Sequence, residues 1–80
     1  MPTSQLELDT TAVDVSTDEQ TLRVVLADGR EIITPLLWFP RLANATPEQL
    51  SAWRLIGHGI GIAWDALDEH LSVAGLLRQH

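Results

Sequence analysis

The stretch Pro35-Leu36-Leu37-Trp38-Phe39-Pro40-Arg41-Leu42 joins a predicted β-hairpin on its N-terminal side to a predicted helical half on its C-terminal side. It is the densest apolar run in the chain, and it contains the only phenylalanine. Pro35 cannot donate to a strand ladder, so it is expected to end the hairpin. Pro40 favours an extended backbone at Phe39. This constrained segment therefore predicts how the two halves of the chain meet.

The large side chains of this stretch could have either of two roles. Core packing is the expected role of Leu36, Trp38 and Leu42, which would pack at the edge of the core. The alternative role of Trp38 is a rigid aromatic anchor for a partner, with Arg41 beside it.

Strand-like alternation on both sides of Asp28-Gly29 predicts the hairpin, with strands over residues 21–26 and 31–34. A two-residue type I′ turn at Asp28-Gly29 would place Val25 opposite Ile32. In that register Leu22, Val24 and Ile33 face the core. The opposite face would then carry Arg23, Val25, Ile32 and Thr34. Because that face is mixed rather than polar, we expect either a loop or terminus covering it, or a partner.

The remaining elements follow from local signals. Residues 1–10 are polar and are expected to form a flexible arm. Period-two alternation predicts a first strand over 11–16 and a later strand over 60–64. Thr46-Pro47-Glu48-Gln49 is a capping box that predicts a helix over about 46–55, and Ser72 is expected to cap a short last helix. The prediction is a single α+β domain over 11–80: a small antiparallel sheet in β-β-β-α-β-α order, with two short helices packed on one face.

Composition limits the function. The chain has 80 residues, a net charge of −6, no cysteine and five basic residues, all of them arginine. This acidity argues against direct nucleic-acid binding and suits a basic protein partner. The N-terminus resembles no signal peptide, and no apolar run reaches the ~20 residues of a membrane helix, so a cytoplasmic protein is expected.

No constellation in the sequence points to catalysis or to a metal. The glycines at 57, 59 and 61 lack the spacing of a phosphate loop, and a turn that lets two backbones approach is expected. The three histidines form no spaced ligand pair. Asp65, Asp68 and Glu69 have no neighbouring nucleophile, so we expect a solvated acidic connection. We expect no enzyme activity, cofactor or metal.

The chain resembles a bacterial family known as domain of unknown function 2442. The resemblance covers roughly residues 10–78, and two positions depart from it, Ala63 and His70. Its motifs are Asp28-Gly29-Arg30, Pro35-Leu36-x-Trp38-Phe39-Pro40-Arg41-Leu42, Ala45-Thr46-Pro47-Glu48-Gln49, Trp53, the glycine run, Ile62-x-Trp64, Leu67-Asp68-Glu69 and Leu71-Ser72-Val73-x-Gly75-Leu76-Leu77.

The resemblance implies a small α+β fold with a few antiparallel strands and two helices on one face. It implies no reaction. Members of the family are found as lone short proteins, beside another small gene in what look like toxin–antitoxin pairs, or fused to a helix-turn-helix domain. We expect no such DNA-reading segment in this chain.

We therefore expect a non-enzymatic protein-interaction module, an antitoxin-like or regulatory member of a small two-protein system. It would bind another protein, and a homodimer is left open. The expected binding surface is either the sheet face of Arg23, Val25, Ile32 and Thr34 or the corner of Trp38 and Arg41.

Two alternatives remain. One is a sensor that binds a small ligand in a groove between sheet and helices, near Trp38, Trp53 and Trp64. The other is an acidic inhibitor of a nucleic-acid enzyme, of the anti-restriction or anti-CRISPR type, which would imitate phosphate charge.

Overall fold

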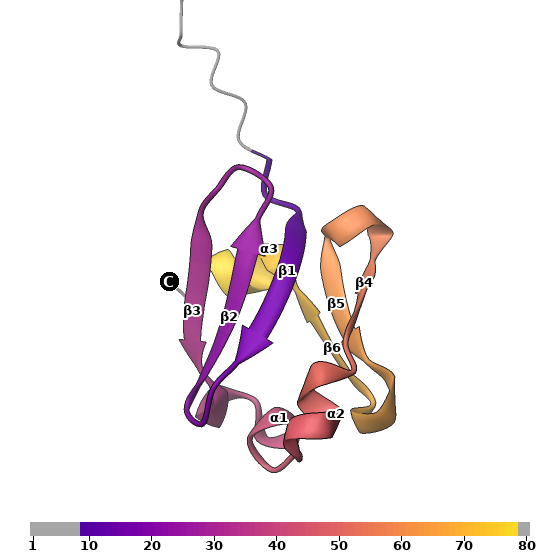
Figure 1. Cartoon of the computed structure of the whole chain (residues 1–80). Coiled ribbons are helices and arrows are strands. Elements are labelled where there is room, and N and C mark those ends of the chain that lie inside the picture. Colours follow the sequence, from indigo (N-terminus) through magenta and orange to yellow (C-terminus); the bar gives the residue numbers. More distant parts are fainter. Residues whose placement is uncertain (1–8, 79–80) are drawn as a thin grey trace, which may run out of the picture.

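The computed structural model describes residues 9–78 and has an α+β fold (Figure 1). It has two antiparallel three-stranded sheets, with strand orders β1-β2-β3 and β4-β5-β6. The strands are β1 (Ala12–Thr17), β2 (Thr21–Leu26), β3 (Glu31–Pro35), β4 (Arg54–Ile56), β5 (Gly61–Trp64) and β6 (Glu69–Ser72).

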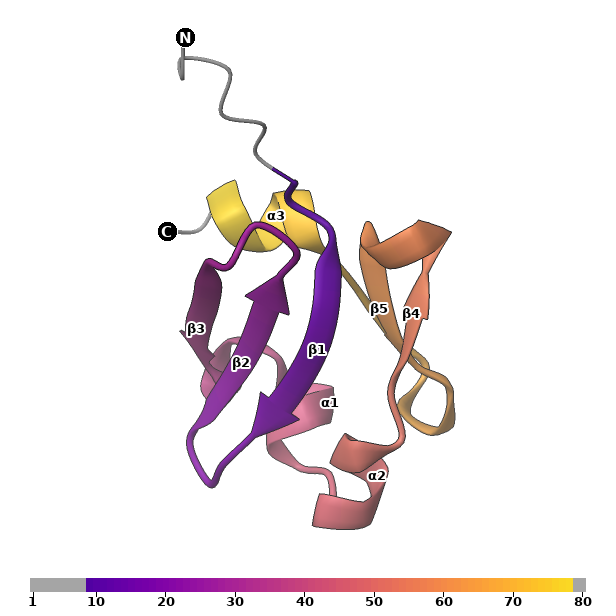
Figure 2. The same cartoon turned by 45° about the horizontal axis from the view of Figure 1, so that its top comes forward.

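Short helices connect these strands. They are the 3-10 turns η2 (Leu36–Trp38), η3 (Gly57–Gly59) and η4 (Asp65–Leu67), and the α-helices α1 (Pro40–Ala43), α2 (Pro47–Ser51) and α3 (Val73–Arg78). In Figure 1 α3 lies behind the first sheet, and α1 and α2 lie below the end where β3 stops. In both views the second sheet lies on the β1 side (Figures 1 and 2). No helix in residues 9–78 is long and apolar enough to cross a membrane.

The α+β class is confirmed, but the predicted order was incomplete because the chain has two sheets instead of one. β4 lies partly within the span predicted as helix, and α2 ends at Ser51 rather than near residue 55. β6 begins at Glu69, which was predicted to belong to an acidic connection. Both missed strands are short, and neither carries a fully buried side chain, so their sequence patterns are weak.

One core lies between the two sheets and α3. Trp64 and Ile62 of β5 are fully buried, as are Leu22 and Val24 of β2. Val73 and Leu76 of α3 join the same cluster, together with Ala12, Val15, Leu26, Ile32, Leu36, Phe39, Leu42 and Leu50.

The β2–β3 hairpin has a different register from the predicted one. Gly29 N donates to Leu26 O at 2.9 Å, and Leu26 N donates to Arg30 O at 2.8 Å, which closes a three-residue loop with Gly29 at φ 94°. This is a type I turn followed by a left-handed glycine rather than a two-residue type I′ turn. Val25 therefore pairs with Glu31.

A one-residue slip moves every side chain of β3 to the other face. Ile32 and Thr34, predicted on the outward face, are buried with 4% and 1% of their surface exposed, whereas Ile33 is 53% exposed. Arg23 and Val25 lie on the outward side as predicted. The observed register is favoured because it puts Ile32 opposite Val24, so that two β-branched apolar side chains share the core face.

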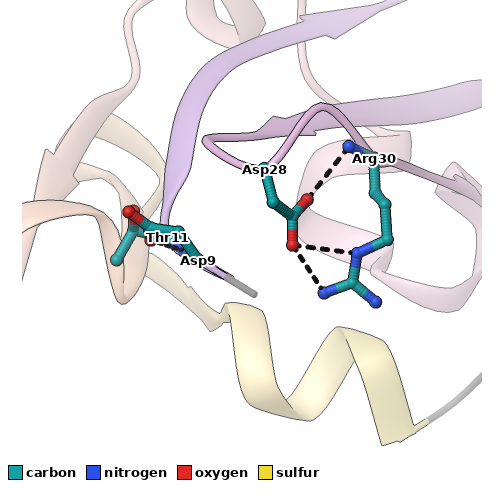
Figure 3. Close-up of polar contacts among 4 residues, drawn as sticks. All are labelled: Asp9, Thr11, Asp28 and Arg30. Atoms are coloured by element: carbon teal, nitrogen blue, oxygen red, sulfur yellow. Dashed lines mark hydrogen bonds and ion pairs between the residues drawn. The ribbon is translucent and has the colours of Figure 1, made fainter. Parts of the chain in front are cut away.

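Polar contacts of Asp28 hold the loop in this form (Figure 3). Its carboxylate accepts hydrogen bonds from Arg30 N and Nε, both at 3.0 Å. Asp28 N donates to Asp9 O at 3.1 Å, and the Asp9 carboxylate accepts from Thr11 N and Oγ1. The chain just before β1 is thus fastened to the hairpin loop. Of the predicted flexible arm, residues 1–8 lie outside the described residues.

The two predicted helix caps are present. Thr46 Oγ1 accepts from Gln49 N at 3.1 Å, while Thr46 N donates to Gln49 Oε1 at 3.0 Å, which completes the capping box. Ser72 Oγ accepts from Gly75 N at 2.9 Å at the start of α3. These hydrogen bonds satisfy amide groups that have no partner within their helices.

The glycine run forms the expected close turn. Gly57, His58 and Gly59 all have positive φ, at 59°, 58° and 97°. A Cβ on Gly59 would lie 2.6 Å from Ala12 O, so the glycine lets η3 approach β1. The strand predicted over 60–64 begins one residue later, because β5 starts at Gly61, and Ile60 is 64% exposed.

Candidate functional site

The turn between β1 and β2 is rigid and acidic. The Asp18 carboxylate accepts hydrogen bonds from Gln20 N at 2.8 Å, Thr21 N at 2.7 Å and Thr21 Oγ1 at 2.9 Å. The pKa of Asp18 is lowered, chiefly by the hydrogen bond from the Gln20 amide and then by that from the Thr21 amide. Asp18 therefore carries its negative charge at neutral pH, next to the exposed Glu19.

Four surface hollows adjoin this β1–β2 turn, which we define as Thr17–Thr21. The largest of them is a groove of about 750 Å³ between the turn and the helices α1 and α2. We call it the turn–helix groove; it is lined by Val15, Ser16, Thr17, Asp18, Glu19, Leu36, Ala43, Ala45, Pro47, Leu50, Ser51 and Trp53.

The turn–helix groove has apolar walls and an acidic edge. Leu36 and Leu50 belong to the core cluster, and the partly buried Trp53 packs against that cluster. Among residues 9–78, Asp18 and Glu19 are the charged lining residues, and no arginine or histidine belongs to the lining. The groove can therefore accept an apolar group that has a cation beside it.

Two smaller hollows flank the turn on its other sides. One is lined by Glu19 and Thr21 together with Pro35 and the exposed Leu37. The other lies on the outward side of the first sheet, between the turn, Arg23 and Ile33. The turn thus stands between the groove and the outward sheet face.

The outward face of the first sheet is a mixed surface. Arg23 forms two hydrogen bonds with Glu31, Nε to Oε1 at 2.8 Å and Nη2 to Oε2 at 2.7 Å. The hydrogen bond from Arg23 lowers the pKa of the Glu31 carboxyl. Beside this pair lie the half-buried Val25, which pairs with Asp14, and the exposed Ile33.

Trp38 does not pack in the core, which was its expected place. Trp38 is 49% exposed, and its predicted core position is taken by Phe39, at 8%. The 3-10 turn η2 breaks the strand alternation, which exposes Leu37 and Trp38 and turns Leu36 and Phe39 inward. Leu36 and Leu42 are buried as predicted.

Arg41 connects the two halves of the chain. Its Nη1 donates to the backbone oxygen of Asp68 and lies 3.6 Å from Oδ2 of the same residue. Asp68 has positive φ, at 52°, at the end of η4. Arg41 therefore joins α1 to the segment that leads into β6.

The three tryptophans do not share one groove. Trp64 is fully buried, and its Nε1 donates to Leu50 O at 3.0 Å. Trp53 lines the turn–helix groove, whereas Trp38 is exposed on η2. The predicted groove between sheet and helices exists, but only Trp53 of the three indoles lines it.

Arginine–carboxylate pairs are spread over the surface. They are Arg23–Glu31, Arg30–Asp28, Arg41–Asp68 and Arg54–Asp65. The pKa of Asp65 is lowered, chiefly by its hydrogen bond from Arg54. Within residues 9–78, Asp14, Asp18, Glu19 and Glu48 have no arginine partner, so excess negative charge remains around the first sheet and α2.

Histidine and carboxylate side chains are not gathered into a metal site: no group of three or more in the described part of the chain could hold an ion.

The sequence interpretation overlooked most of the lining of the turn–helix groove. The signal that could have found it is Asp18 in Thr17-Asp18-Glu19-Gln20, because an aspartate that accepts from the amides two and three residues later is typical of a rigid turn. Pro47 was assigned only to a helix start, and of the residues that line the groove only Trp53 was named as a groove residue.

A family model described as "Protein of unknown function (DUF2442)" matches residues 11–80. Two solved structures are similar to the chain, and each is 30% identical in sequence. A crystal structure of a protein of unknown function from Rhodospirillum rubrum ATCC 11170 has a TM-score of 0.75, with 86% of each chain covered. A solution NMR structure of an uncharacterised protein from Chromobacterium violaceum has a TM-score of 0.71, covering 85% of this chain and 64% of that one. No curated protein matches the chain.

Proposed function

The chain belongs to the DUF2442 family, and from that premise we propose that it is a non-enzymatic protein-interaction module. We place it as the antitoxin-like or regulatory member of a small two-protein system. The observation that supports this proposal is the exposure of large apolar side chains where β3 passes into η2: Ile33 at 53%, Leu37 at 83% and Trp38 at 49%.

These three side chains lie within six consecutive residues, where β3 passes into η2. Single exposed apolar residues are ordinary on a protein surface. Here Leu37 and Ile33 each line a hollow next to the same turn. Exposed apolar side chains that gather beside concave surfaces mark a site of protein interaction or ligand binding.

Charge supports a basic partner. The chain carries a net charge of −6, and Asp18 and Glu19 occupy the turn between the hollows. An acidic surface accelerates association with a basic protein and disfavours acidic ones.

Affinity capture from a lysate of the host cell tests the proposal. Leu37→Ser removes the most exposed of the apolar side chains without touching the core. Ile60→Ser is the matched control, because Ile60 is 64% exposed and follows η3, which lies against Ala12 at the end of β1 opposite the β1–β2 turn. We expect Leu37→Ser to lower recovery of a specific protein at least ten-fold and Ile60→Ser to leave it unchanged. Equal recovery with both variants would contradict the proposal.

A second candidate is a small-ligand sensor, which the turn–helix groove favours. Its volume of about 750 Å³ lies within the range of about 300–1,000 Å³ common for ligand sites. Trp53 lies in its wall, so a bound metabolite would change the tryptophan fluorescence. This candidate predicts a fluorescence change with fractionated host metabolites that is lost in Trp53→Phe.

A further inference from the structure

We propose that the turn–helix groove binds a segment of the protein partner in which a basic side chain stands next to apolar ones. The inference rests on the proposed function and deepens it by assigning a site and a chemistry to the partner. The basic group would meet Glu19 and Asp18, and the apolar groups would cover Leu36, Leu50 and Trp53.

The walls of the groove supply the apolar part of this recognition. More than half of the lining residues are apolar, and Leu36 and Leu50 continue into the core. Trp53 is only partly buried, so part of its indole remains accessible. An indole surface can pack against an aliphatic side chain or a guanidinium group.

The edge of the groove supplies the charge. Asp18 already accepts three hydrogen bonds from its own turn, so its charge is fixed in place. Glu19 is exposed and forms no hydrogen bond or ion pair with residues 9–78, so it is the carboxylate available to a partner.

Among residues 9–78, no arginine or histidine lines the groove. Four of the five arginines, Arg23, Arg30, Arg41 and Arg54, each pair with a carboxylate outside the groove lining. A partner's cation would therefore meet uncompensated negative charge, whereas an anionic group would be repelled.

The outline of the groove favours a chain segment over a compact ligand. The neighbouring hollow that leads to Leu37 shares Glu19, Leu36 and Ala43 with the groove. The two concavities thus meet along Glu19 and Leu36 and form a track toward the exposed Leu37. A peptide segment can fill such a track, with one residue in the groove and its neighbours beyond it.

NMR titration of the isotope-labelled full chain tests the inference with three probes. The probes are acetyl-Leu-Arg-Leu-amide, acetyl-Leu-Glu-Leu-amide and the small cation agmatine. We expect the arginine peptide to shift the signals of the Trp53 indole and of Ser16–Glu19 at least five-fold more than the glutamate peptide does. Glu19→Gln should reduce those shifts at least three-fold. Glu48→Gln, which removes a carboxylate of α2 outside the lining, should leave them unchanged.

Three results would overturn the inference: equal shifts with the arginine and glutamate peptides, shifts confined to residues outside the groove, or agmatine binding as tightly as the arginine peptide. The third result would indicate a small-cation site. Failure here is distinguishable from failure of the proposed function. Suppose that capture of a protein is lost with Leu37→Ser but unchanged by Glu19→Gln. This result would refute the binding site in the groove, and it would still agree with the proposal of a protein-interaction module.

Discussion

The indole Nε1 of Trp64, on β5, donates a 3.0 Å hydrogen bond to the backbone oxygen of Leu50, in α2. α2 spans five residues, so its last carbonyl groups have no later helical amide to bind. The buried indole supplies the missing donor for one of them. The same contact fastens the second sheet to the helix that lines the turn–helix groove.

Replacing Trp64 with phenylalanine should therefore weaken the fold. Trp64→Phe leaves the Leu50 oxygen without this donor in the core, which costs about 1–3 kcal/mol of the free energy of unfolding. Urea unfolding followed by circular dichroism measures the loss. Trp53→Phe is the control and should lose less, because Trp53 is only partly buried and donates no hydrogen bond to the described residues. Equal losses in the two variants would contradict the role given to Trp64.

The hairpin register can be tested with two neighbouring isoleucines. Ile32 is 4% exposed and Ile33 is 53% exposed. Ile32→Ala should lower the free energy of unfolding by about 2–5 kcal/mol, whereas Ile33→Ala should change it by about 0.5 kcal/mol. The reverse ranking, measured in the same urea titrations, would favour the two-residue turn and place Ile33 in the core.

The register also shows where the sequence is ambiguous. The alternation of apolar and polar residues predicts the strands β2 and β3 and a turn at the glycine between them. It does not predict the length of the loop. A two-residue loop and a three-residue loop both suit Asp28-Gly29, and they differ in which face of β3 is buried. The choice depends on tertiary contacts, such as those of Asp28 with Arg30 and Asp9, and these are not readable from local pattern.

Local chemistry was the most predictable part of the fold. The capping box at Thr46, the cap at Ser72 and the close turn at Gly59 each follow from residue types a few positions apart. The exposure of Trp38 and the strand β4 were missed, because both depend on where a turn or short helix ends. The turn–helix groove joins β1 to α2 across some thirty residues, and no short motif encodes it.

Two glycines with positive φ should respond differently to alanine. Gly29 has φ 94° but open space around the Cβ position, so Gly29→Ala should cost about 1–2 kcal/mol for the left-handed backbone alone. Gly59 has φ 97°, and its Cβ would also lie 2.6 Å from Ala12 O. Gly59→Ala should therefore lower the thermal midpoint further than Gly29→Ala does. Equal midpoints would show that η3 does not lie against β1.

The stability should fall in acid. The pKa values of Asp18, Asp28 and Asp65 are lowered from 3.8, and that of Glu31 from 4.5, chiefly by hydrogen bonds to the charged forms. A carboxyl with a lower pKa in the folded state contributes stability that is fully present above its unfolded pKa and is lost as the pH falls through its folded pKa. The urea midpoint should thus stay nearly level from pH 7 to about 5.5 and decline below about pH 4.5.

Asp18→Asn should reduce that decline, because it removes one of the carboxyl groups with a lowered pKa. Glu48→Gln is the comparison, since the Glu48 side chain forms no hydrogen bond to residues 9–78. A urea midpoint that rises on acidification would contradict the assignment of these carboxylates.

The central claim is that the surface around the β1–β2 turn binds a protein. Backbone hydrogen exchange tests it most directly, measured on the full chain with and without the protein that the chain captures from host lysate. We expect binding to slow exchange at least ten-fold across 16–21 and 36–38, and to leave 57–60, at the other end of the molecule, unchanged. Slowed exchange at 57–60 with no change around the turn would contradict the account.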